Sequence, residues 1–129
     1  MKNLAILMLL VFAYSCSGEN KAVIGEYTSI EVDEIYDAGT VAKGEIVKAE
    51  IKVKNTGDYP FVIANVKGAC SCTVSSYEED PIPPGETTTI KAEVDTGSTG
   101  KGMITKSVSI IANTRPSTTT INIKAKVID

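Results

Sequence analysis

The sequence predicts a single all-β domain, in which two antiparallel sheets pack face to face as a β-sandwich of about seven to eight strands. Several segments alternate apolar and polar residues at every second position, as strands with one buried and one solvated face do. Turn-forming residues separate these segments about every 8–12 residues. No segment repeats its apolar residues with the 3.6-residue period of an amphipathic helix.

The chain opens with a segment, residues 1–15, that resembles a bacterial lipoprotein signal peptide. Lys2 supplies a positive charge, and residues 4–12 form an unbroken apolar run. The run is too short to cross a bilayer, which takes about 20 residues, but it suits the apolar part of a signal peptide. Because Ser15 precedes Cys16, the resemblance implies cleavage before Cys16 and attachment of a diacylglycerol to its sulfur. The alternative is ordinary secretion, with Cys16 unmodified.

A lipid on Cys16 would hold the chain on a membrane, because each buried methylene group contributes about 0.8 kcal/mol and two or three acyl chains make a stable anchor. Residues 16–26 are then the lipidated cysteine with a short polar tether, and residues 27–129 are the sandwich domain. The expected location is the bacterial cell envelope. Ser17 after Cys16 favours the outer membrane by resemblance to enteric sorting, with the domain facing the periplasm or the cell surface.

Composition excludes several classes of function. Loss of Lys2 with the signal peptide lowers the formal net charge from −3 to −4, and no basic cluster stands out, so a nucleic-acid partner is not expected. Histidine is absent, which rules out a Ser-His-Asp or Cys-His catalytic set within this chain. With no histidine and few sulfur ligands, no structural zinc site or cofactor is expected. We expect a non-enzymatic protein.

The first half of the domain carries the clearest strand signal. A weak strand is expected near residues 28–32 and a further piece near 35–41. Residues 47–54 alternate strictly between apolar and charged side chains, which predicts a strand with one dry and one wet face. A turn follows at 55–58, and residues 61–66 form a shorter, more apolar strand that leads into the cysteine segment.

The second half repeats this pattern. Three prolines between residues 78 and 85 mark a break between strands, because proline cannot donate to a ladder. Residues 87–95 alternate again, and the glycine-rich stretch 96–102 predicts a hairpin turn. The next strand spans 104–112, with Lys106 out of pattern and near the strand end, and a last strand spans 119–127.

Short motifs distributed along this pattern resemble the bacterial domain of unknown function 1573 family. The resemblance covers nearly all of residues 27–128 and rests on Lys54-Asn55-Thr56-Gly57, Cys70-Ser71-Cys72-Thr73 and Pro84-Gly85-Glu86. It implies an immunoglobulin-like antiparallel β-sandwich related to Hydin-type and major-sperm-protein-type domains, often carried on envelope lipoproteins. It implies no established activity, so the fold does not supply a function.

Cys70 and Cys72 form the chemically most interesting spot. In a regular strand their Cα atoms would lie about 6.5 Å apart, near the upper limit for a disulfide, so a bridge needs a turn or bulge. Gly68 and Ala69 allow one. In an oxidising envelope the alternatives are a structural bridge or two buried thiols, a strained redox-active disulfide, and two thiolates that bind Cu(I). Lys67 is a nearby charge that would favour a thiolate.

Other motifs imitate known sites. Asp95-Thr96-Gly97 looks like the aspartic protease motif, but no second copy accompanies it, so Asp95 is interpreted as a turn residue. Residues 97–102 lack the spacing of a phosphate-binding loop. The acidic residues 78–80 are expected to form a solvated loop rather than a calcium site. Four tyrosines could line a recognition surface or cover the core: Tyr27, Tyr36, Tyr59 and Tyr77.

Together these observations favour a membrane-anchored envelope lipoprotein that acts as a non-enzymatic binding or structural module. Its expected partners are the membrane, through the lipid, and an envelope protein or glycan. The alternative is a thiol protein, either redox-active or Cu(I)-binding, that uses Cys70 and Cys72.

Overall fold

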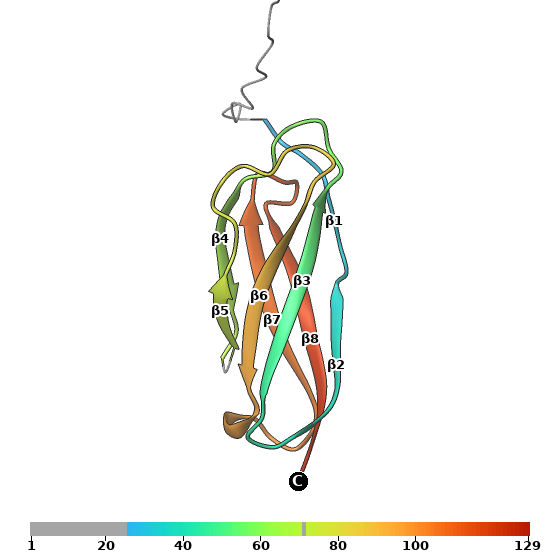
Figure 1. The fold of residues 1–129 in the computed structure, drawn as a ribbon, viewed down its shortest axis with the longest axis vertical. Coiled ribbons are helices and arrows are strands. Elements are labelled where there is room, and N and C mark those ends of the chain that lie inside the picture. Colours follow the sequence, from blue (N-terminus) through green and yellow to red (C-terminus); the bar gives the residue numbers. More distant parts are fainter. Residues whose placement is uncertain (1–25, 71) are drawn as a thin grey trace, which may run out of the picture.

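The computed structural model describes residues 26–70 and 72–129. The predicted signal peptide, Cys16 and nearly all of the tether lie outside the described residues. The described chain forms eight strands and one short 3₁₀ helix, arranged as an elongated sandwich that begins at one end and finishes at the other (Figure 1). No helix among the described residues is long and apolar enough to cross a membrane. The predicted all-β sandwich is confirmed.

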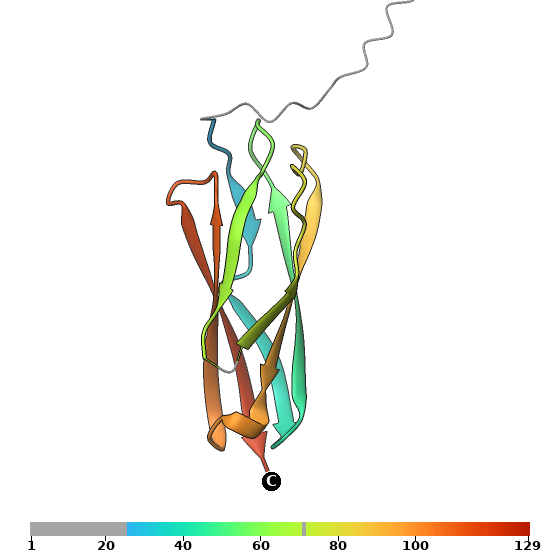
Figure 2. The same cartoon turned by 90° about the vertical axis from the view of Figure 1, so that its left-hand side faces the viewer.

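Two four-stranded sheets form the two layers, which separate clearly in the view turned by 90° (Figure 2). The first sheet has the strand order β1-β3-β6-β5 and the second has the order β2-β8-β7-β4. The strands are β1 (Ile30–Val32), β2 (Ile35–Ala42), β3 (Ile46–Asn55), β4 (Ile63–Gly68), β5 (Cys72–Ser76), β6 (Thr87–Asp95), β7 (Gly102–Ala112) and β8 (Thr118–Ile128).

The first two strands, β1 and β2, follow each other closely in the chain but lie in different sheets. β1 pairs antiparallel with the end of β3, at Val53–Asn55, and the chain then crosses at Asp33 and Glu34 to the second sheet. There β2 lies beside β8 in a parallel pairing. All other pairings are antiparallel, so the sheets differ from the prediction at this one edge. The parallel pair arises because β2 continues in the direction of β1 instead of turning back.

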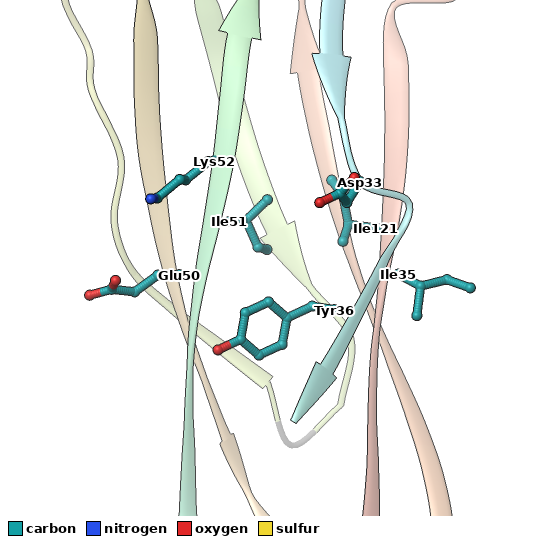
Figure 3. A pocket seen from close by; sticks show the side chains of 7 residues that line it. All are labelled: Asp33, Ile35, Tyr36, Glu50, Ile51, Lys52 and Ile121. Carbon is teal, nitrogen blue, oxygen red and sulfur yellow. The ribbon is translucent and has the colours of Figure 1, made fainter. Parts of the chain in front are cut away.

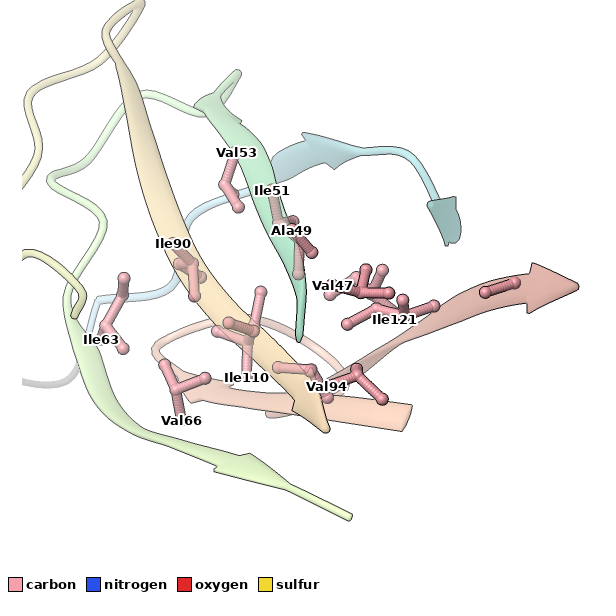
Figure 4. Packing of buried hydrophobic residues seen from close by; sticks show 14 of the residues in the cluster. Val47, Ala49, Ile51, Val53, Ile63, Val66, Ile90, Val94, Ile110 and Ile121 are labelled. Atoms are coloured by element: carbon pink, nitrogen blue, oxygen red, sulfur yellow. The ribbon is translucent and has the colours of Figure 1, made fainter. Parts of the chain in front are cut away.

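The core lies between the sheets and is built from the apolar positions of the alternating pattern (Figure 4). On β3 burial alternates without exception, and the same is true of the inward positions near the middle of β6 and β8. Ile90, Ile121 and Phe61 are completely buried. Burying a large apolar side chain contributes about 1.5–3 kcal/mol, so this two-residue period is what holds the layers together.

Three local expectations need correction. β4 begins at Ile63 rather than at Phe61, because the backbone of Phe61 pairs instead with Ile82 across the proline loop. The stretch 96–102 is not a hairpin turn, since β6 and β7 belong to different sheets and a 3₁₀ helix, Thr96–Ser98, joins them. Lys106 lies in the middle of β7, not near its end.

Candidate functional site

The two cysteines lie at the turn where the chain crosses from β4 in the second sheet to β5 in the first. The Cys72 N–H donates to the carbonyl of Ala69 at 2.9 Å, which closes the turn. A Cβ on Gly68 would lie 2.6 Å from the Cys72 carbonyl oxygen, so the close approach of the backbone requires glycine there. Cys70 is exposed, Cys72 is half-buried, and both are free thiols in the structure.

The surroundings of Cys72 favour its neutral form. Burial raises the pKa of the Cys72 thiol, and the positive charge of Lys106 partly opposes that rise. The charge that acts on Cys72 is therefore that of Lys106, and not of the exposed Lys67 that the sequence suggested. A reactive or metal-binding cysteine needs a lowered pKa, so the geometry gives the redox and Cu(I) alternatives no support.

Lys106 was out of pattern because it occupies an inward position of β7. β4 pairs with Val108 and the residues beyond it, and the Ala69 N–H donates to the Ser107 carbonyl, so within the described chain no strand pairs with β7 on that side at Lys106. The gap lets a long side chain keep its aliphatic part against the sandwich and its ammonium group near water. Sequence periodicity could not reveal this, because the gap depends on where β4 stops.

Asp95-Thr96-Gly97 forms a structural turn. Asp95 Oδ1 accepts from the Gly97 N–H at 2.8 Å and caps the 3₁₀ helix. The buried Thr96 hydroxyl donates to the Glu45 carbonyl at 2.6 Å. Lys43 Nζ then donates to the carbonyls that end the turn, at 2.6 Å for Thr99. Each polar group has a structural partner, in agreement with Asp95 as a turn residue.

The remaining motif residues also have structural surroundings. The exposed residues 78–80 are held by a hydrogen bond from the Asp80 N–H to Glu78. Within residues 26–70 and 72–129 no three acidic or cysteine side chains come together to hold a metal ion. Tyr36 and Tyr77 pack against the core, whereas Tyr59 and Tyr27 are exposed.

Two of the family-like motifs meet at one end of the sandwich, around Asn55. Its side chain is fully buried and accepts from the Thr28 hydroxyl at 2.7 Å, while its amide donates to the carbonyls of Tyr59 and Ile82. The Pro84-Gly85-Glu86 turn is bonded to the Asn55 backbone: the Asn55 N–H donates to the Glu86 carbonyl, and the Gly85 N–H donates to the Asn55 carbonyl. Gly85 has a φ of 83°, which the turn requires and which favours glycine. These motifs are structural.

One feature with unused binding capacity is the edge of β3. Because β1 pairs only with Val53–Asn55, no strand of the described chain pairs with residues 46–52 of β3 on that side. We call residues 46–52 the open edge. On its other side the same segment pairs continuously with β6, so the open edge is held straight by a full ladder.

The backbone groups that face the open edge follow from the ladder. The N–H and C=O of Asn55 bond to Glu86 and Gly85 on the β6 side. Since successive residues of an antiparallel strand direct these groups to opposite sides, Lys48, Glu50 and Lys52 direct theirs outward. Only the Tyr36 hydroxyl, at 3.5 Å from the Lys48 carbonyl oxygen, reaches the open edge as a hydrogen-bond partner among the described residues.

A groove with apolar lining residues and three charged ones, Asp33, Glu50 and Lys52, lies beside the open edge, where β2 has moved away to the second sheet (Figure 3). The Tyr36 ring reaches from β2 toward β3, and Ile51 and Ile121 lie at the bottom of the groove. Its volume is about 180 Å³, well below the roughly 300 Å³ of small-molecule sites. The groove therefore fits a side chain better than a free ligand. Sequence reasoning missed it, because no motif marks the point where β1 leaves β3.

Comparisons with known proteins agree with this architecture. The model of a family described as proteins of unknown function, DUF1573, matches residues 29–127. A protein of unknown function from Porphyromonas gingivalis W83 superposes with a TM-score of 0.67 and 26% identity over 78% of this chain. This chain covers 47% of that protein, about half of its length. No curated protein sequence matches.

More distant structures share the fold alone. An ASH / PapD-like domain of human CEP192 superposes with a TM-score of 0.56 and 11% identity, covering 80% of this chain and 87% of that domain. Part of the secreted serine protease VesC from Vibrio cholerae superposes with a TM-score of 0.65 at 11% identity, over 79% of this chain and 24% of the protease. The predicted immunoglobulin-like class is thus confirmed through PapD-like neighbours.

Proposed function

Because this chain belongs to the DUF1573 family of proteins of unknown function, we propose its role from the open edge: a non-enzymatic protein-binding module of the bacterial cell envelope. The single observation that carries the proposal is the open edge, residues 46–52 of β3. Every second residue there directs its backbone groups outward, and Lys48, Glu50 and Lys52 so offer donors and acceptors beside a partly apolar groove.

Such an edge binds by strand addition. An extended segment of a partner can extend the first sheet by one strand, so that main-chain hydrogen bonds supply affinity and the groove selects a side chain. Inward side chains of that segment would contact Tyr36 and Ile51. Outward side chains would contact the exposed charged side chains of β3, which are Lys48, Glu50 and Lys52. Unused edges invite pairing unless they are covered, and of the residues that the structure describes only the Tyr36 hydroxyl bonds to this edge.

The anchor part of the proposal rests on the N-terminal sequence. The apolar run 4–12 and the Ser15-Cys16 pair support a lipid on Cys16 and a short tether before the domain. The described chain begins at one end of the sandwich, whereas the open edge lies along its side (Figure 1). A membrane attached through the first residues would leave the long side of the sandwich accessible to a partner.

The binding role is tested by photo-crosslinking in intact cells. A photoreactive amino acid replaces Lys48 on the open edge or, as a control, Lys126, an exposed lysine on β8 in the other sheet. We expect a discrete adduct from position 48 and none from position 126. Equal labelling from the two positions would contradict a binding role for the edge.

A second variant shows that the backbone is responsible. Glu50→Pro removes one outward N–H and leaves every hydrogen bond between β3 and β6 in place, because proline is tolerated where the N–H faces away from the ladder. We expect the position 48 adduct to disappear in this variant while the far-ultraviolet circular dichroism stays that of a β-sheet. An undiminished adduct would overturn strand addition.

The anchor is tested separately from the edge. Cells fed an alkyne-labelled fatty acid should label the native chain and not a Cys16→Ala variant, and intact mass should show that the chain begins at Cys16. A native chain that retains residues 1–15, or takes up no label, would remove the anchor but not the binding edge.

A further inference from the structure

We infer that the partner of the open edge is the open edge of a second copy of this chain, paired antiparallel about a two-fold axis at Ala49. The inference rests on the proposed function of this edge and names its occupant. The first sheets of the two copies would then join at β3 into one continuous sheet. Three features of β3 carry the inference: its hydrogen-bond phase, its length and its charge order.

The hydrogen-bond phase permits this register. A two-fold axis at Ala49 sets Lys48 opposite Glu50 of the second copy and Ile46 opposite Lys52 of the second copy. All of these residues are at even positions, which are the positions that direct their N–H and C=O groups outward. Each facing pair can therefore exchange two backbone hydrogen bonds. An axis that paired even with odd positions would leave these groups unmatched.

The length of the open edge matches the same register. Pairing with β1 begins at Val53, and β3 begins at Ile46. Ala49 is the midpoint of the segment 46–52 between these limits, so the whole open edge is used by both copies. An axis at Ile51 would bring Lys54 into the contact, where β1 already lies. A register with its axis at Ile51 would require β1 to give up its pairing at Lys54. The register at Ala49 requires no such change and is therefore preferred.

Charge order selects the register among those with the correct phase. With the axis at Ala49, Lys48 faces Glu50 of the second copy, and this opposite-charge pair occurs twice. Moving the axis to Glu50 would set Glu50 against Glu50 and Lys48 against Lys52, which are like-charge pairs. Opposite charges directly across two strands stabilise the pairing and like charges destabilise it.

The inward and end positions also fit. Val47 and Ile51, both buried within their own copy, would face each other across the joint and close the groove. Ile46 keeps 45% of its surface exposed, and the aliphatic part of Lys52 from the second copy would cover it. The long 3.5 Å contact of Tyr36 with the Lys48 carbonyl would be exchanged for the Glu50 N–H of the second copy.

The test uses charge reversal in the full chain, purified in mild detergent and measured by native mass spectrometry over a concentration series. Lys48→Glu or Glu50→Lys each create two like-charge pairs and should weaken the dimer about tenfold or more. The double reversal restores both pairs and should restore the dimer. Lys126→Glu makes the same change of charge on β8 and should leave the dimer unchanged.

Stability effects within one copy predict a different order. Lys48 faces Glu93 and Glu50 faces Lys91 on β6, so the double reversal creates two like-charge pairs inside each copy. If the variants acted only by destabilising the domain, the double reversal would be the weakest dimer. Recovery of the dimer in the double variant therefore identifies contact between copies.

The register is read directly by zero-length carbodiimide coupling of a mixture of ¹⁵N-labelled and unlabelled chains. We expect a mixed-isotope crosslink between Lys48 and Glu50, lost in either single variant. A chain that stays monomeric to millimolar concentration, or a crosslink that joins only residues of one isotope, would overturn the inference. If the photo-adduct at position 48 then contained a different protein, the proposed binding edge would stand and only the second copy would be excluded.

Discussion

Replacement of Asn55 by alanine tests whether the Lys-Asn-Thr-Gly motif is a structural element. The Asn55 side chain makes four hydrogen bonds in a fully buried position, and alanine removes all of them. Two of the four partners keep another bond: the Gly57 N–H still donates to Ser29, and the Ile82 carbonyl still accepts from Phe61. The Thr28 hydroxyl and the Tyr59 carbonyl lose the partners described here.

The magnitude follows from these two groups. A buried polar group left without a partner costs about 1–3 kcal/mol, and the Thr28 side of the site is buried. Tyr59 is partly exposed, so water can reach its carbonyl and the cost there falls at the low end. We expect Asn55→Ala to lower the free energy of unfolding by about 3 kcal/mol, a large part of the roughly 5–15 kcal/mol of a domain.

Urea unfolding followed by circular dichroism measures this loss, with Asn65→Ala as the matched control. Asn65 is exposed on β4 and, among the described residues, accepts only from the adjacent Val66 N–H, so its replacement should cost less than about 0.5 kcal/mol. A loss below about 1 kcal/mol for Asn55→Ala, or equal losses for the two variants, would refute the structural reading of the motif.

Four further outcomes are expected. Since burial raises the pKa of the Cys72 thiol against the opposing charge of Lys106, Lys106→Met should move the pH midpoint of Cys72 alkylation upward, whereas Lys67→Met should not. Because the pKa of Cys72 is raised in the folded state, its neutral thiol contributes stability that is full below the pKa of the unfolded thiol and is lost as the pH rises. The urea midpoint should therefore fall at alkaline pH, and it should fall less in Cys72→Ala. Lys43→Met should cost about 1 kcal/mol in urea unfolding, because the carbonyls that end the 3₁₀ helix lose their ammonium donor. Gly57→Ala should lower the melting temperature by several degrees, since its Cβ would lie 2.6 Å from the Ser29 nitrogen and also overlap the Thr28 hydroxyl.

The cysteine pair illustrates how far spacing alone could go. Sequence indicated that Gly68 and Ala69 would allow a turn, and the structure has that turn between β4 and β5. It did not indicate which lysine acts on Cys72, because Lys106 is distant in sequence and comes close only across the two sheets. Lys67 is nearer to Cys72 in sequence, but it is exposed and is not the charge that acts on the Cys72 thiol.

The order of apolar and polar side chains determined by itself where the chain forms strands and which face of each strand is buried. That information is local, because every second side chain of a strand lies on the same face whatever its neighbours are. β3 and β8 therefore have the buried faces that the sequence predicts.

Only the tertiary structure decided which strands are neighbours and where their pairing stops. The change of sheet at Asp33 and Glu34 leaves residues 46–52 of β3 without a partner strand, and the early end of β4 leaves the inward position of Lys106 beyond the paired part of β7. Both depend on contacts between segments far apart in the chain, which no local pattern encodes. The open edge is thus a product of the packing of the whole domain.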